Sequence, residues 1–125
     1  MGKAVHILFI DNDEAIRRLF GGKLASAGFE MLYAEDGNEG REIARRMQPD
    51  LILLDIRMPD PDGYTVARRL KGERKTAHIP IVFFANEDFT PEAEKMLKEA
   101  WITDYIHKSI TPSELVKRIQ GIVGK

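Results

Sequence analysis

The sequence contains no cysteine, which excludes disulfide bonds, thiol catalysis and thiolate metal sites. It also has no apolar run near the roughly 20 residues that a membrane-spanning helix needs, and the run at residues 5–10 is far too short for a signal peptide. Its 19 basic and 20 acidic residues leave a formal charge of −1, so we expect no broad basic surface. These absences are compatible with a cytoplasmic domain that binds neither nucleic acid nor membrane.

The composition that remains is that of one globular domain. Apolar residues make up 43% and charged residues 31% of the 125 positions, an ordinary balance for a folded domain. A chain of this length buries roughly two thirds of the surface that it exposes when unfolded, so its core needs no metal or disulfide. We expect residues 1–125 to form a single domain, with no output domain in this chain.

Short apolar runs alternate with segments of helical periodicity along the chain. Five runs predict strands at residues 5–10, 29–34, 51–54, 79–84 and 105–107. Helices are expected between and after these strands, one of them at residues 64–70. The helix residues expected to face the core are Ile16, Leu19, Phe20, Leu24, Ile43, Ala44, Met47, Ala93, Met96, Leu97, Ala100, Leu115, Ile119, Ile122 and Val123.

Three of the expected helices carry capping signals at their starts. Asp36 can cap the helix that follows it. Thr90 is followed by Pro91, a pairing typical of an N-cap and the first helical position. Residues 111–114 (TPSE) match a capping box with proline in the first turn.

Five strands alternating with five helices predict an α/β fold with a parallel sheet covered on both faces. The first, third and fourth expected strands are nearly all apolar, as central strands must be. We therefore expect a flavodoxin-like (βα)5 three-layer sandwich with strand order 2-1-3-4-5. Right-handed crossovers then put the first and last helices on one face and the middle three on the other.

A sheet of this order forms a crevice at the carboxyl ends of its first and third strands. The residues that follow the strands are therefore the ones of interest: Asp11, Asn12, Asp13, Asp55, Ala85, Asn86, His107 and Lys108. Two or three of these carboxylates and the lysine are expected to meet in one shallow pocket. Clustered carboxylates repel one another unless a cation joins them, and Mg²⁺ is a natural partner because it prefers oxygen ligands. Lys108 adds a point charge suited to a phosphate oxygen.

Three strings give this crevice a family likeness. They are FIDNDEAIRR at residues 9–18, LILLDIRMPDPDGY at 51–64 and DYIHKS at 104–109. These strings resemble the signature regions of response-regulator receiver domains, and their spacing matches over the whole chain.

The resemblance implies a role for each residue of the crevice. Asp55 would be the phosphoacceptor, and Lys108 would contact the phosphoryl group. Asp11, Asn12, Asp55 and the backbone carbonyl of Arg57 would hold Mg²⁺. The phosphoryl donor would be a histidine kinase, a phosphotransfer protein or a small acyl phosphate. Such a domain signals through a partner protein and catalyses only its own phosphorylation and dephosphorylation, so it is not an enzyme in the usual sense.

The sequence departs from the family pattern at three positions. Asn12 stands where the family has a second acid, which should weaken Mg²⁺ binding. Ala85 stands at the position of a switch serine or threonine, whose charge-assisted hydrogen bond is worth about 1.5–3 kcal/mol. Ser109 follows Lys108 in place of proline, so we predict a trans bond there, because a cis bond before a non-proline residue costs about 2.5–4 kcal/mol.

Other residues near the crevice have two interpretations each. Tyr105 matches the family's aromatic switch, although it could be a simple edge-strand aromatic, and the small Ala85 could leave it room to stay inward. Trp101 could pack locally or contact a partner. Arg57 and Glu87 could pair across the mouth of the crevice or stay solvated. Asp13 is expected at the start of the first helix, where the helix dipole favours an acid.

Two alternative functions remain open. The substitutions Asn12, Ala85 and Ser109 are compatible with a phosphorylation-independent receiver that acts as a protein-interaction module. A haloacid-dehalogenase-type phosphatase is more remote, because the Asp-x-Asp string at residues 11–13 is followed by Ala15 rather than threonine or valine. In either receiver reading, the expected partner surface combines the fourth helix, the fifth strand and the last helix.

Overall fold

The structure is a computed structural model that describes residues 3–124. Its strands are β1 (His6–Ile10), β2 (Glu30–Ala34), β3 (Leu51–Leu54), β4 (Ile81–Ala85) and β5 (Asp104–His107). Its helices are α1 (Glu14–Ser26), α2 (Gly37–Met47), α3 (Gly63–Gly72), α4 (Pro91–Lys98) and α5 (Pro112–Val123). The predicted alternation of five strands and five helices is confirmed.

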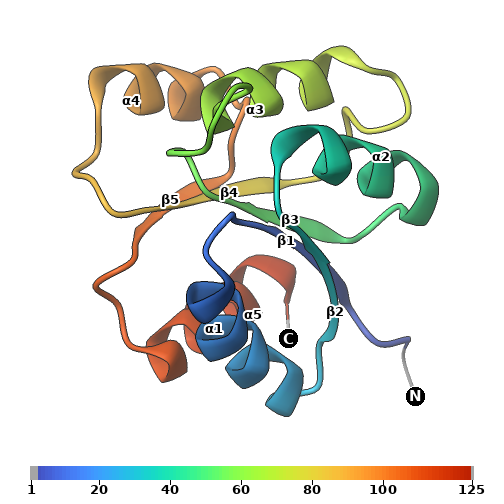
Figure 1. The fold of residues 1–125 in the computed structure, drawn as a ribbon, viewed down its shortest axis with the longest axis vertical. Coiled ribbons are helices and arrows are strands. Elements are labelled where there is room, and N and C mark those ends of the chain that lie inside the picture. Colours follow the sequence, from blue (N-terminus) through green and yellow to red (C-terminus); the bar gives the residue numbers. More distant parts are fainter. Residues whose placement is uncertain (1–2, 125) are drawn as a thin grey trace.

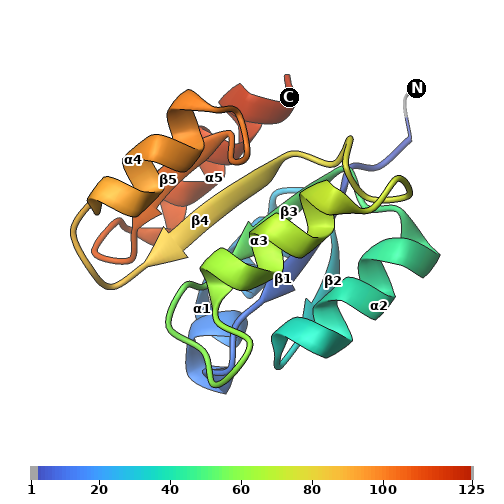
Figure 2. The same ribbon diagram turned by 90° about the horizontal axis from the view of Figure 1, so that it is seen from above.

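The five strands form one parallel sheet in the order β2-β1-β3-β4-β5, as predicted. Figure 1 shows α1 and α5 on one side of this sheet and α2, α3 and α4 on the other, and Figure 2 shows the second group lying over the sheet, roughly along the direction of the strands. The register pairs Ile10 of β1 with both Ala34 and Leu54. The tips of β1 and β3 therefore lie side by side, which places the residues after them in one crevice.

The core consists of two apolar layers, one on each face of the sheet. One layer joins Ala44, Val66 and Met96 of the middle helices to the sheet. The other joins Phe20 of α1 and Ile119 of α5 to the opposite face. Among the described residues, no helix is long and apolar enough to cross a bilayer.

Some predicted core positions are wrong. Leu19, Met47, Leu97 and Ala100 are exposed. Leu19 and Leu97 each lie one residue, or about 100° of helix rotation, from a buried neighbour, so they fall outside a buried stripe that is narrower than expected. Met47 is the last residue of α2, and Ala100 follows the end of α4 with a left-handed φ of 63°.

The start of the fourth strand also differs from the prediction. Ile79 donates its backbone N–H to Thr76 O (3.1 Å), so it belongs to the turn before the strand. Pro80 has no N–H to give to the sheet. The strand therefore begins at Ile81 and extends to Ala85. The capping signals at Asp36, Thr90 and Thr111 are all confirmed.

Candidate phosphoryl and magnesium site

The carboxyl ends of three strands bring one lysine and two carboxylates into contact. Nζ of Lys108 lies 2.7 Å from Oδ2 of Asp11 and 3.1 Å from Oδ1 of Asp55. These side chains are at most 5% exposed. The expected meeting of residues from the tips of β1, β3 and β5 is therefore present, and it forms a buried ionic cluster.

Asp11 is fixed by the turn between β1 and α1. Its N–H donates to Ala34 O (3.1 Å), which continues the sheet by one residue. Its Oδ1 accepts from the Asp13 N–H (2.9 Å), and its backbone carbonyl accepts from the Arg17 guanidinium. Oδ2 is buried and accepts no hydrogen bond from the described residues. This oxygen is therefore held in place with Lys108 as its ionic neighbour.

Asp55 is placed by β3 and lies in an environment that disfavours its charge. Its N–H donates to Ile10 O (2.9 Å), and the residue is 4% exposed. Burial raises the pKa of the Asp55 carboxyl, and repulsion from Asp11 raises it further, while Lys108 partly offsets both effects. The carboxylate thus has few competing hydrogen-bond partners and faces a cation, which suits a nucleophile that must attack an anionic phosphoryl group.

Lys108 is held by both its backbone and its side chain. Its N–H donates to Ala85 O (2.7 Å), which ties the segment after β5 to the tip of β4. Its ammonium also lies 5.8 Å from the centre of the Phe84 ring, within the range of a cation–π interaction. These contacts direct the ammonium between the two carboxylates.

The residues expected to hold Mg²⁺ lie around this cluster. Within residues 3–124, no three histidine, cysteine, aspartate or glutamate side chains are grouped so as to hold a metal ion. The cluster offers two carboxylates, and an amide oxygen of Asn12 and the backbone carbonyl of Arg57 are the further oxygens that the sequence predicts for the site. An oxygen-only donor set, in which the buried Oδ2 of Asp11 has the Lys108 ammonium as its neighbour, fits a hard divalent cation. Asn12 is exposed, so its amide is accessible from solvent.

Asp13 has a structural role. It is the N-cap of α1, and its Oδ1 accepts from the N–H groups of Ala15 (2.9 Å) and Ile16 (3.2 Å). Its predicted place at the helix start is confirmed, one position before the first turn. Because its carboxylate is engaged there, Asp13 does not replace the missing acid at Asn12.

The loop between β4 and α4 contacts Tyr105 directly. Ala85 is fully buried and carries no hydroxyl. Tyr105 points to the loop instead, and its hydroxyl donates to Glu87 O (2.6 Å) and Asp88 O (3.1 Å). Burial, followed by the charge of Glu87, raises the pKa of Tyr105 to about 12. Tyr105 is thus a half-buried, hydrogen-bonded residue and not a simple surface aromatic.

Arg57 and Glu87 form the predicted pair across the mouth of the crevice. Nε of Arg57 lies 2.5 Å from Oε1 of Glu87, and a second contact spans 3.2 Å. The hydrogen bond and charge of Glu87 raise the pKa of the Arg57 guanidinium. Because the Arg57 side chain is 76% exposed, the pair adds little to stability.

Two further expectations have clear outcomes. Among the described residues, the cis peptide bond is that between Asp60 and Pro61, so the bond between Lys108 and Ser109 is trans, as predicted. Trp101 is partly buried and packs against the core layer beneath the middle helices, which favours its local-packing interpretation.

Sequence reasoning missed two residues that shape the cluster. Phe84 was assigned only to the apolar strand, and its place beneath Lys108 follows from the pairing of β4 with β5. Arg17 lies in the string at residues 9–18, four residues after Asp13 and thus one helical turn into α1. Its spacing from the cap could have indicated a side chain that returns to the β1 tip.

Comparisons with known proteins point to one family. Residues 7–120 match the family described as the response regulator receiver domain. The chain is 33% identical over 117 residues to the DNA-binding dual master transcriptional regulator RpaA of Synechocystis sp., covering 94% of this chain and 48% of that protein. It spans about half or less of the length of the curated relatives it matches.

Solved structures agree on the fold. The chemotaxis response regulator CheY4 of Vibrio cholerae superposes with a TM-score of 0.86 at 26% identity, covering 96% of this chain and 99% of that one. The receiver domain of the sensor histidine kinase PA1611 from Pseudomonas aeruginosa, described with a magnesium ion coordinated in its active site cleft, gives a TM-score of 0.85 at 24% identity, covering 98% and 100%. At that lower identity the likeness concerns the fold alone.

Proposed function

The chain belongs to the response regulator receiver domain family, and from this premise we propose that it accepts a phosphoryl group on Asp55 in a Mg²⁺-dependent reaction. The donor would be the phosphohistidine of a histidine kinase or phosphotransfer protein. The observation that carries the proposal is the buried cluster in which one ammonium lies within 3.1 Å of two carboxylates.

The charges in the cluster support a site for an additional cation. Two carboxylates share one ammonium, so one negative charge is left unbalanced in a place that water hardly reaches. Asp11, Asp55 and the Arg57 carbonyl would hold Mg²⁺, with Asn12 as an uncharged fourth ligand. The ion would neutralise charge on the phosphoryl oxygens.

The transfer itself needs little from the protein beyond position and charge. A carboxylate oxygen of Asp55 attacks phosphorus in line with the bond to the donor imidazole. The new O–P bond forms as the N–P bond breaks, and the bonding electrons stay on the imidazole nitrogen. Lys108 would leave Asp55 for a phosphoryl oxygen while keeping its contact with Asp11. Water can later hydrolyse the acyl phosphate.

The output surface that we propose combines α4, β5 and α5. Phe89, just before α4, and Leu97, within it, are large apolar side chains that remain exposed. Phe89 packs edge-on against Tyr105 of β5, with ring centres 5.1 Å apart. A downstream protein could therefore contact α4 and sense the position of Tyr105 on the same surface.

Incubation with acetyl phosphate and Mg²⁺, followed by intact-mass measurement, tests the proposal. The wild-type chain should gain the mass of one phosphoryl group, and the gain should vanish without Mg²⁺ and in Asp55→Asn. As a matched control, Asp50→Asn changes an exposed acid just before β3, at the opposite end of that strand from Asp55, and should keep the adduct. Absence of an adduct on the wild-type chain at every Mg²⁺ concentration would contradict the proposal.

A phosphorylation-independent interaction module is the second candidate, and one observation favours it. Tyr105 is already bonded to the β4–α4 loop with no phosphoryl group present. The same mass measurement separates the two functions. The phosphatase alternative loses its second acid, because Asp13 is engaged in capping α1.

A further inference from the structure

Ala85 leaves this receiver without a hydroxyl at the tip of β4, so a phosphoryl group on Asp55 needs another route to α4. One path runs from the backbone of Asp55 through the start of α3 to the start of α4. The inference that follows concerns the regulation of the proposed site and rests on the proposed function.

The first step of this path is a close backbone contact. A Cβ placed on Gly63 would overlap the Asp55 carbonyl oxygen and lie 2.6 Å from Cα of Ile56. The N–H of Gly63 also donates to Ile56 O (2.8 Å). The first residue of α3 is therefore pressed against the peptide that follows the phosphoacceptor, and a shift of that peptide must move the start of α3.

The second step is a hydrogen bond between two hydroxyls. Tyr64 follows Gly63 in the first turn of α3, and its Oη lies 2.6 Å from Oγ1 of Thr90. Tyr64 is 8% exposed, and its ring packs edge-on against Phe83, with centres 5.5 Å apart. The hydrogen bond is partly buried, which strengthens it relative to one fully exposed to water.

The third step is the start of α4. Oγ1 of Thr90 also accepts from the Ala93 N–H (3.0 Å), which makes Thr90 the N-cap of α4. This helix has eight residues, a length that is marginal without support from outside. Its position therefore depends on its cap and on the buried side chains of Ala93 and Met96.

The geometry points to the Tyr64–Thr90 hydrogen bond as the link that passes a change at Asp55 to α4 in this chain. Tyr64 acts as a positioning residue, since the hydrogen bond described for its hydroxyl is with Thr90 and not with a residue of the ionic cluster. This hydrogen bond couples the crevice to α4 in place of the contact that a hydroxyl on residue 85 would make. An ion pair between Arg68 and Glu92 also joins α3 to α4, but both side chains are more than 40% exposed and hydrated.

Backbone amide NMR spectra with and without Mg²⁺ plus beryllofluoride, a phosphoryl mimic, test this link. In the wild-type chain, signals should shift both at the crevice and in α4, at Ala93 and Met96. In Tyr64→Phe, which removes one oxygen, the crevice shifts should remain while the α4 shifts fall roughly threefold or more. Thr90→Ser, which keeps the hydroxyl and the cap, should retain them.

Three matched variants define the controls. Tyr33→Phe removes a phenol oxygen on β2, and Glu92→Gln removes the exposed ion pair, so both should leave the α4 shifts unchanged. Tyr105→Phe removes the hydroxyl that holds the β4–α4 loop by its carbonyls. If Tyr105→Phe abolishes the α4 shifts and Tyr64→Phe does not, the link runs through β5 and the inference is wrong.

A second perturbation keeps this test independent of phosphorylation. Asp55→Asn changes the crevice without any ligand, and its effect on the α4 amides can be measured in the wild-type and Tyr64→Phe backgrounds. If Asp55→Asn shifts the α4 amide signals in the wild-type background and not in the Tyr64→Phe background, the link is supported even without beryllofluoride binding. A failure of beryllofluoride to bind would count against the proposed function alone. If neither perturbation reaches Ala93 or Met96 in the wild-type chain, the link does not exist.

Discussion

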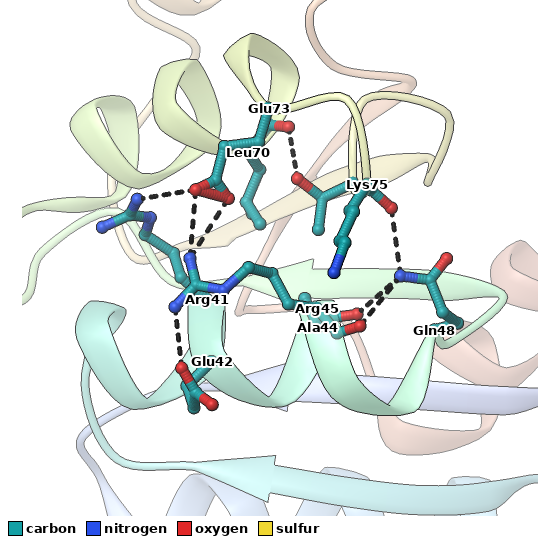
Figure 3. Close-up of polar contacts among 9 residues, drawn as sticks. Arg41, Glu42, Ala44, Arg45, Gln48, Leu70, Glu73 and Lys75 are labelled. Atoms are coloured by element: carbon teal, nitrogen blue, oxygen red, sulfur yellow. Dashed lines mark hydrogen bonds and ion pairs between the residues drawn. The ribbon is translucent and has the colours of Figure 1, made fainter.

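Two clusters of acids and bases, at different places in the fold, differ in burial and in the balance of their charges. At the strand tips, Asp11 and Asp55 share Lys108, and the exposed fraction of each side chain is 5% or less. Between α2 and α3, Glu73 accepts from Arg41 (3.1 Å) and Arg45 (3.0 and 3.2 Å), and these side chains are 21–34% exposed. Figure 3 shows Glu73, which follows the last residue of α3, facing both arginines of α2.

The two clusters therefore serve different purposes. The arginines outnumber Glu73 but remain partly hydrated, and Arg45 gains a second partner in Glu42 (2.7 Å). Gln48 adds a hydrogen bond to Lys75 O (3.0 Å), so this cluster joins α2 to the segment after α3 (Figure 3). In the crevice, an excess carboxylate is buried, which opposes folding unless a further cation binds. Burial with unbalanced charge marks the functional cluster.

Removing the shared ammonium should have the largest effect. Lys108→Met leaves two buried carboxylates facing each other, and breaking a buried pair costs on the order of 3 kcal/mol of unfolding free energy. Saturating Mg²⁺ should restore more stability to this variant than it adds to the wild-type chain, because the ion supplies the missing charge. Urea unfolding with and without Mg²⁺ measures both the loss of unfolding free energy in Lys108→Met and the stability that Mg²⁺ restores. An equal Mg²⁺ effect on the two proteins would show that the ion does not bind between the carboxylates.

The second-largest effect is expected when an acid is placed at residue 12, where the family pattern has one. Asn12→Asp adds a negative charge beside the cluster and should lower the Mg²⁺ concentration at half-saturation by roughly tenfold, which corresponds to about 1.4 kcal/mol of added attraction between partly screened charges. Titration of crevice amide signals with Mg²⁺ gives this value. Asn38→Asp makes the same chemical change in the first turn of α2 and should leave it unchanged; a similar gain there would mean that only net charge matters.

A smaller effect should appear in the pH dependence of the stability that Asp55 contributes. The pKa of Asp55 is raised in the folded chain above its ordinary value, so the folded state binds this proton more tightly than the unfolded state. The contribution of Asp55 to stability is therefore present at low pH and is lost as pH rises through the raised pKa. Asp55→Asn should consequently gain in stability relative to the wild-type chain as pH rises from about 4 to 7. A difference that stays constant over this range would contradict the raised pKa.

The smallest effect is expected between α2 and α3. Glu73→Gln keeps hydrogen-bond acceptance but removes the charge, and it should lower the urea midpoint by about 0.3 M, with the difference shrinking in high salt. Glu42→Gln removes only the pair between Glu42 and Arg45, in which Glu42 is more exposed than Glu73. It should therefore change the urea midpoint less. A large, salt-independent loss in Glu73→Gln would place this cluster in the same class as the crevice.

The strand order and the crevice could be predicted because both depend on short-range patterns. Apolar runs identify the central strands, and parallel topology forces residues such as Asp11 and Asp55 to the same edge of the sheet. Asp13 could be placed for a similar reason, since capping depends on a few neighbouring residues.

Contacts between separate helices could not be predicted in this way. The Tyr64–Thr90 bond depends on how far apart α3 and α4 lie, which no periodicity in either segment specifies. Leu97 was expected to be buried because α4 is amphipathic, but its exposure depends on the narrow strip that a short helix presents to the sheet.

The proposed function requires that Mg²⁺ and a phosphoryl group bind at the buried cluster, and that Lys108 moves from Asp55 to the phosphoryl group while it keeps its contact with Asp11. A crystal structure of the chain grown with Mg²⁺ and beryllofluoride tests it most directly. We predict beryllofluoride on a carboxylate oxygen of Asp55, Mg²⁺ against Asp11 and the Arg57 carbonyl, and Lys108 moved from Asp55 to a fluorine atom. A structure in which Lys108 still joins Asp11 to an unmodified Asp55, with both reagents saturating, would contradict the account.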